Sequence, residues 1–536
     1  MSTDDNSPPS ASPCDPGTDL VDAPAPSNVN TCAPPIAELL LLVLLGVIFA
    51  RLSYWWGMHQ FGGMDHSAII DVGWRLFCGQ KPYTDFPCTF PVGFYLGAEL
   101  AFRLFGVFWK SIIKFNVLYF LLTYFWLYAV FRVHFRRGYL PLLLALACEC
   151  LTLIRNSYWW YNSVTSITAI LYFASVAAVL LRPRSRPLWL SLCLSLFLLA
   201  LMKPNASAPL IVGGTIALLM DRHTRKHVLT VSIIAFALWF GTIAIHHSTI
   251  RQVLGSYLSV ASYAFSMNHP GCPSNVPTRI DWVCAILAVV GFPLPLFLGK
   301  RIHFEPPLSI LILAALIAGA MAFYSNSEPR LDALSLVFVA SLLFSTRFGD
   351  LTGAGSAHTF LKSILPLSAI GCLFVTMSLR EAVTRERVRT IGPSRFFENK
   401  IDDTPIQDGF FEGLYTGHNL KTCISSIRTL LNSVGHRPIF FGNRVQWAYA
   451  AFGLPDHVGL PIVWEPGVTF AFSDEPMLTQ RWLDARFDLL VIFEFKFFDQ
   501  KIIDRARRAY EYEGPVMMHS DPGANIGPLL VFVRVR

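Results

Sequence analysis

Long apolar runs separated by short polar segments fill most of the first 380 residues of the chain. An α-helix needs about 20 apolar residues to cross the hydrocarbon core of a bilayer. The runs approach that length, so the pattern predicts an all-α polytopic membrane bundle of about 11 helices. The predicted spans are 36–56, 111–131, 139–154, 163–181, 188–202, 208–220, 228–245, 282–298, 307–324, 333–344 and 361–379.

The segment 57–110 departs from this pattern, because its apolar periodicity is shorter and is interrupted by glycines and prolines. Apolar residues recur at helical spacing between Ile69 and Phe77, which predicts an amphipathic helix lying on the membrane surface. A second such helix is predicted over 91–105. Asp71 is assigned to the solvated face of the first helix.

The two ends of the chain are polar and flank a transmembrane domain over 36–380. Residues 1–35 are rich in Pro, Ser, Asp and Ala, and they are predicted to be a disordered tail. From Glu381 the composition becomes that of a soluble protein, which predicts an α/β domain over 381–536. Its expected strands are 438–441, 489–493 and 529–535, and its expected helices are 421–431 and 501–510.

Clusters of Lys and Arg between the spans predict the orientation of the bundle. If 91–105 lies on the membrane surface, the basic clusters that begin at Arg132, Arg182 and Arg222 all fall on the same side of the membrane. The positive-inside rule makes that side cytoplasmic. The N-terminus is then cytoplasmic. The loop 57–110, the segment 155–162, Lys203, the loop 246–281 and the C-terminal domain are exterior. The expected location is the plasma (inner) membrane.

Composition narrows the classes of partner. Hydrophobic residues make up 53% of the chain and charged residues 15%, which leaves too little polar surface for several soluble domains. The net charge of +7 comes from Lys and Arg between apolar runs, so a nucleic acid is not an expected partner. No C-x-x-C spacing suggests a zinc site, and Cys78 and Cys88 could pair if their loop faces an oxidising compartment.

The loop 57–110 also contains the most informative candidate chemistry. Asp65 opens its first predicted helix at the mouth of the bundle, where a carboxylate beside lipid and basic residues is suited to act as a general base. Asp is also a favoured N-cap residue, so helix capping alone is the alternative. Lys203 ends a span in the run Met-Lys-Pro-Asn, and its alternative role is to reach the lipid headgroups.

The layout of this loop resembles that of the GT-C superfamily of membrane glycosyltransferases, which use polyprenyl-phosphate sugars. Members include aminoarabinose transferases and protein O-mannosyltransferases. The resemblance covers most of the membrane part and lies in the order of its elements. These are Asp65, Ala68, Gly79, the pair Pro82-Tyr83, the run Pro91-Val92-Gly93 and the pair Phe105-Gly106.

The resemblance implies an inverting transfer of a sugar from a polyprenyl phosphate to an acceptor at the exterior face. Asp65 would deprotonate the acceptor hydroxyl, and Lys203 would bind the donor phosphate. Lys81 and Arg155, with Arg75, are further candidates for that phosphate. The remaining substrate-binding candidates are Tyr83 and Asp85, the latter with an equally good role in a turn. The acceptor could be a lipid, a cell-envelope glycan or a protein.

Two departures from the family pattern affect these expectations. Where many members carry a second acidic residue, this chain has His66, which weakens the case for a bound metal. No cofactor is therefore predicted, and a divalent metal stays an alternative. Many members also have a lysine before the second surface helix, where this chain has Thr89-Phe90, so Lys81 or Arg103 could substitute for it.

Two rival functions remain. A transporter or flippase of lipid-linked sugars would be expected to show internal repeats or buried charges, and Glu149, within the predicted span 139–154, is a candidate for such a charge. A non-catalytic membrane scaffold would have the same fold. The aromatic run Trp159-Trp160-Tyr161 suits either an aromatic belt at the membrane surface or stacking on a sugar.

Overall fold

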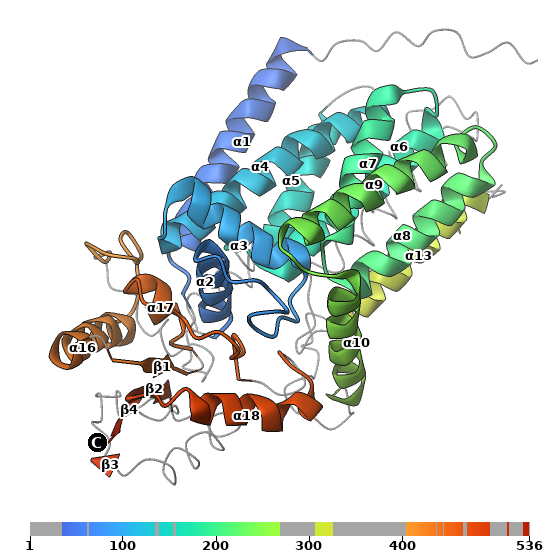
Figure 1. The fold of residues 1–536 in the computed structure, drawn as a ribbon. Helices are drawn as coiled ribbons and strands as arrows, with labels where there is room; N and C mark the ends of the chain where they lie inside the picture. The colour runs from blue at the N-terminus through green and yellow to red at the C-terminus, as the bar shows by residue number, and fades with distance from the viewer. Residues whose placement is uncertain are drawn as a thin grey trace, which may run out of the picture.

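The computed structural model describes residues 35–61, 64–134, 139–153, 157–267, 306–324, 404–435, 437–442, 444–464, 469–493, 512–513 and 529–534. Within these ranges, eight helices form an elongated bundle and coincide within a few residues with predicted spans (Figure 1). They are α1 (Ile36–Gly57), α4 (Trp109–His134), α5 (Leu140–Leu153), α6 (Tyr161–Leu181), α7 (Arg186–Ala200), α8 (Pro204–Met220), α9 (Arg225–Ile245) and α13 (Pro306–Tyr324).

The bundle has the surface expected of a membrane protein. Helices α1, α4, α6 and α9 are long and apolar enough to cross a membrane. Large apolar side chains of α1 and α9 point outward, among them Leu40 and Leu229, which are 66% and 69% exposed. Such rows of exposed apolar side chains fit lipid rather than water. The predicted spans 282–298, 333–344 and 361–379 lie outside the described residues.

Two short helices cross one end of the bundle, as the sequence predicts. They are α2 (Met64–Phe77) and α3 (Val92–Phe105), and they pack on each other between the bundle and the C-terminal elements (Figure 1). Helix α3 begins after Pro91 and ends at Gly106, which has a φ of +85° that suits glycine. Gly73 of α2 allows the close contact, because a Cβ there would lie 3.0 Å from that of Ala98.

The environment of α2 differs from the prediction. Its apolar residues Ile69 and Val72 are buried, but so are Asp71 and Arg75, at 0% and 2% exposure. The expectation that Asp71 faces solvent is therefore wrong. The polar face of α2 is covered by the C-terminal segment, so the helix is enclosed by protein on both faces.

The predicted exterior loop 246–281 contains a helix that the apolar runs did not indicate, α10 (Ile250–Met267). It stands beside the end of α9 (Figure 1), and its Tyr257 hydroxyl accepts a hydrogen bond of 3.2 Å from the backbone N–H of Val92. Helix α10 therefore packs against the start of α3.

The C-terminal part combines helices with a sheet, in line with the α/β pattern. Its described helices are α16 (His418–Val434), α17 (Trp447–Ala451), the 3-10 turn η3 (Phe472–Asp474) and α18 (Glu475–Asp484). Its strands are β1 (Ile439–Phe441), β2 (Leu489–Phe493), β3 (Tyr512–Glu513) and β4 (Leu529–Arg534). The predicted helix 501–510 lies outside the described residues.

The sheet has the order β1-β2-β4-β3, with β1 parallel to β2 and the other two pairs antiparallel. The described residues of the apolar strand β2 are buried, as expected for a central strand. One face packs on α17, and through it the core continues into α2 and the bundle. The other face packs with Trp482 of α18 in a second cluster. That 381–536 is a separate domain stays a prediction.

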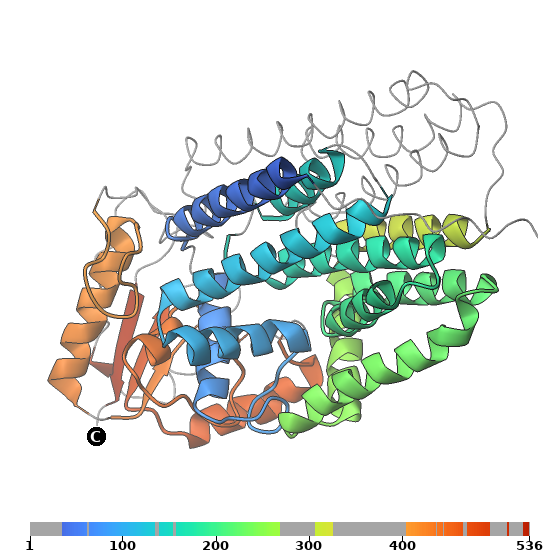
Figure 2. The same cartoon turned by 90° about the horizontal axis from the view of Figure 1, so that it is seen from above.

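Segments predicted to share one membrane side lie together at one end of the bundle (Figure 2). The amide of Tyr415 donates to the carbonyl of Met58, and that of Gly93 donates to Leu201. The Ser248 hydroxyl reaches the carbonyl of Pro82. Which side of the membrane this end faces stays a prediction.

Candidate active site

The start of α2 is enclosed by aromatic side chains from three segments. Asp65 is the second residue of α2, and its side chain lies outside the described part of the structure. The next residue, His66, is buried, with its ring 4.0 Å from that of Tyr158 and 5.4 Å from that of Trp109. Burial lowers the pKa of His66 to about 3, so its imidazole is neutral at physiological pH.

Lys203 lies at the start of α8, beside the start of α6. Pro204 suits the first helical position, where its missing N–H costs nothing. The Lys203 ammonium donates a 3.3 Å hydrogen bond to Oδ1 of Asn162 and lies 5.2 Å from the centre of the Tyr161 ring. The Lys203 amide donates to the Thr165 hydroxyl. The predicted phosphate ligand is thus held at the end of the bundle that carries α2.

The segment 157–162 connects the two places. Tyr158 contacts His66, next to Asp65, and Tyr161 contacts Lys203. Between them, Trp159 and Trp160 are buried at 3% and 4% exposure. The aromatic-belt interpretation of these two tryptophans is therefore wrong, because their rings pack inside the protein.

The remaining predicted binding residues lie in one turn, residues 80–86. Oδ2 of Asp85 accepts a 2.7 Å hydrogen bond from the Lys81 amide, and the Asp85 amide donates to the Lys81 carbonyl at 2.8 Å. The carboxylate of Asp85 therefore has the predicted turn role. Tyr83 has a φ of +65°, an uncommon value for a residue with a side chain. A role of Lys81, Tyr83 or Asp85 in substrate binding stays a prediction, and Arg155 lies outside the described residues.

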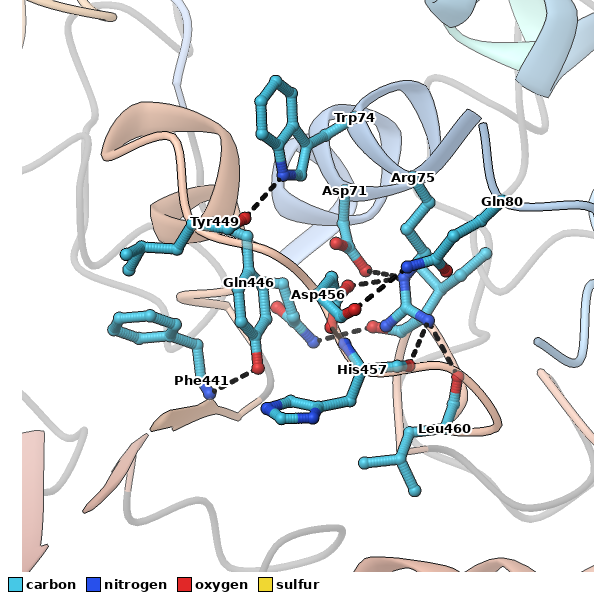
Figure 3. A network of polar contacts seen from close by, with 12 residues as sticks. Asp71, Trp74, Arg75, Gln80, Phe441, Gln446, Tyr449, Asp456, His457 and Leu460 are labelled. Atoms are coloured by element: carbon cyan, nitrogen blue, oxygen red, sulfur yellow. Dashed lines mark hydrogen bonds and ion pairs between the residues drawn. The ribbon is translucent and has the colours of Figure 1, made fainter. Parts of the chain in front are cut away.

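A buried ionic network lies next to this turn, with Arg75 at its centre (Figure 3). Nε of Arg75 lies 3.1 Å from Oδ2 of Asp71 and 2.5 Å from Oδ2 of Asp456. A terminal nitrogen of Arg75 also donates to the carbonyls of Leu460, at 2.9 Å, and His457, at 3.3 Å. Such a planar, permanently charged group can bind several acceptors at once.

Two carboxyl groups share one guanidinium in this network. Burial raises the pKa of Asp71 well above its usual value, and although Arg75 opposes the shift, the Asp456 carboxylate and its hydrogen bond reinforce it. Arg75 thus bridges the two carboxyl groups, and the raised pKa of Asp71 favours the protonated form of that side chain. The sequence contains a signal for the Asp71–Arg75 pair, four residues apart on one helix. It contains none for Asp456.

Other predicted features are reported for the described residues alone. Cys78 and Cys88 are free thiols, the first exposed and the second buried. Across the described ranges, no group of three His, Cys, Asp or Glu side chains is arranged to hold a metal ion.

Comparison with known proteins finds similarity among solved structures. No protein-family model matches the chain, and no curated protein matches it. The crystal structure of ArnT from Cupriavidus metallidurans bound to undecaprenyl phosphate is 12% identical, with a TM-score of 0.49 over 94% of this chain and 99% of that one. Its apo form is 14% identical, with a TM-score of 0.47 over 93% and 98% of the two chains.

A second kind of solved structure is also similar. The apo oligosaccharyltransferase from Archaeoglobus fulgidus is 13% identical, with a TM-score of 0.43 over 92% of this chain and 74% of that one.

Proposed function

We propose that the chain is an inverting glycosyltransferase that moves a sugar from a polyprenyl-phosphate donor to an acceptor at the exterior face of the membrane. The observation that supports this most is the position of 157–162. This one segment contacts the residue beside Asp65 through Tyr158 and contacts Lys203 through Tyr161. The residue next to the candidate base and the candidate phosphate ligand therefore contact a common segment at one end of the bundle.

The reaction follows from these two groups. The Asp65 carboxylate takes the proton of the acceptor hydroxyl, and the acceptor oxygen attacks the anomeric carbon of the donor sugar. The bond from that carbon to the phosphate oxygen breaks, so configuration inverts and the polyprenyl phosphate leaves as an anion. The Lys203 ammonium stabilises the negative charge on the departing phosphate.

The test is transfer of radiolabelled sugar from a panel of polyprenyl-phosphate donors in membranes that contain the protein. Asp65→Asn keeps the size of the side chain but cannot accept the proton, and we expect it to lower transfer by about 100-fold or more. Asp408→Asn is the matched control, because the Asp408 side chain is 77% exposed and its nearest cation, Arg428, is 3.9 Å away.

With protein amounts matched, transfer at the wild-type rate in Asp65→Asn would remove Asp65 from the reaction. Absence of transfer with every donor and acceptor offered to the wild type would contradict the proposal as a whole.

A transporter or flippase of lipid-linked sugars is the alternative that one observation favours. Glu149 of α5 is fully buried in the bundle, where one of its carboxyl oxygens accepts a 2.9 Å hydrogen bond from the Thr123 hydroxyl of α4. Ionisable groups inside a membrane bundle often mark transport pathways. Lipid movement that needs Glu149, without transfer of sugar, would favour this function, whereas full transfer by Glu149→Gln would favour the enzyme.

A further inference from the structure

A loop of the C-terminal part, residues 454–460, holds the end of α2 (Figure 3). We call it the clasp loop. The Trp74 indole donates to the carbonyl of Leu454 at 2.9 Å, and the Gln80 amide donates to the carbonyl of Asp456 at 2.9 Å. The clasp loop thus supplies acceptors for Trp74 and Arg75 of α2 and for Gln80, three residues beyond the end of the helix. This segment is therefore bound by directional polar contacts in addition to apolar packing.

The clasp loop continues onto the turn 80–86. The amide of Gly459 donates to the carbonyl of Asp85, and the Gln80 side chain lies just before Lys81. The Arg75 guanidinium lies 5.2 Å from the centre of the Phe86 ring, which closes the turn. The turn that contains three predicted substrate-binding residues, Lys81, Tyr83 and Asp85, is thus held by its own Asp85 contacts and by the clasp loop.

The strength of this attachment depends on Arg75 and Asp456. Their side chains are each 2% exposed, so neither can exchange its partner for water. Removing one member of such a buried pair leaves the other charge uncompensated. Asp71 differs, because it lies on α2 with Arg75, so its contact does not attach α2 to the clasp loop.

We propose that the clasp loop positions the turn 80–86 for binding the polyprenyl-phosphate donor, with Arg75 and Asp456 as positioning residues. The C-terminal part then completes the donor end of the site rather than only covering it. This inference rests on the proposed function, because the turn matters for donor binding only if the chain uses such a donor.

The first test separates positioning from simple loss of folded protein. Asp456→Asn removes the charge that binds Arg75, and we expect the KM for donor to rise about tenfold while kcat changes little. Lost folded protein would instead lower the apparent kcat and leave KM unchanged. Asp71→Asn imitates the protonated acid, so its rise in KM should be smaller. Equal effects of the two variants, or a fall in kcat alone, would overturn the proposal.

Two further variants keep the test decisive if Asp456→Asn fails to fold. Gln80→Leu removes one contact with the clasp loop and should raise the donor KM without loss of protein. Arg75→Lys keeps the charge but cannot reach all the acceptors, so it should restore only part of the affinity lost in Arg75→Met. An unchanged donor KM in Gln80→Leu and Arg75→Lys would overturn the proposal.

The second test needs no sugar transfer and uses the native thiols near the turn. Cys78 is exposed and Cys88 is buried, so a maleimide should label Cys78 in the wild type and spare Cys88. Release of the clasp loop in Asp456→Asn should expose Cys88, as read by mass spectrometry of the labelled peptides, whereas Glu412→Gln on the protein surface should not.

The two tests distinguish failure of this inference from failure of the proposed function. If Cys88 stays protected from the maleimide in Asp456→Asn and Arg75→Met, the proposal that the clasp loop positions the turn is overturned, even if the enzyme is active. A wild type without transfer, but with Cys88 exposed in the variants, would contradict the proposed function while supporting attachment of the turn by the clasp loop.

Discussion

His66 is buried in its neutral form, so we predict that acid destabilises the fold at the start of α2. Its ring is enclosed by Tyr158, Trp109 and Phe61, and burial lowers its pKa from 6.5 to about 3. The folded protein therefore resists protonation of His66, whereas the unfolded chain accepts a proton near pH 6.5. This contribution to stability is complete above the unfolded pKa and is lost progressively as the pH falls toward the folded value.

The magnitude follows from linkage between protonation and folding. With these two pKa values, lowering the pH from about 7.5 to about 5 removes about 2 kcal/mol of folding free energy. His66→Gln has no titratable group, so it should lose this part of the pH dependence. The variant also loses aromatic packing, but that loss is the same at both pH values.

The assay is unfolding of the purified protein in detergent at the two pH values, compared between wild type and His66→Gln. His457, whose pKa is also lowered mainly by burial, is present in both proteins and cancels in the comparison. We expect the wild type to lose about 2 kcal/mol more than the variant on acidification. Parallel pH dependences would refute the assignment of a neutral, buried His66.

Three further predictions follow from the contacts at the same end of the bundle. A Cβ at Gly97 would lie 2.1 Å from the Trp159 ring, so Gly97→Ala should cost about 1–3 kcal/mol in detergent unfolding, whereas Gly255→Ala, with open space, should not. Lys203→Met should lower kcat/KM for the donor by about tenfold and Lys203→Arg by less, measured by sugar transfer, because arginine keeps the positive charge. A membrane-impermeant maleimide should label Cys78 in intact cells or right-side-out vesicles, and labelling only after permeabilisation would contradict the exterior position of the loop 57–110.

Local pattern in the sequence was enough to locate most described helices. The eight bundle helices and the helices α2 and α3 follow from apolar periodicity, length and prolines, all of which act within a few residues. The strands β1, β2 and β4 follow from short apolar runs for the same reason. Helix α10 was missed because its run is too polar for a span and lies in a long predicted loop.

For the candidate site too, the sequence indicated some residues but not their surroundings. The sequence alone indicated Asp65 and Lys203 through their places in the loop and at the end of a span, and it indicated the turn role of Asp85 through the neighbouring prolines. What these residues face depends on other segments. Tyr158 contacts His66, next to Asp65, and Tyr161 contacts Lys203 only because the bundle brings 157–162 against the starts of α2 and α8.

Only the tertiary structure could show whether the polar face of α2 is exposed to water or covered by protein. A helix with Asp71 and Arg75 on one side resembles a surface helix, and periodicity cannot show whether water or protein covers that side. Here the cover is a loop that follows some 380 residues later. Asp456 offsets the charge of Arg75 and the backbone carbonyls satisfy its remaining donors, so charged groups assigned to solvent are stable in the interior.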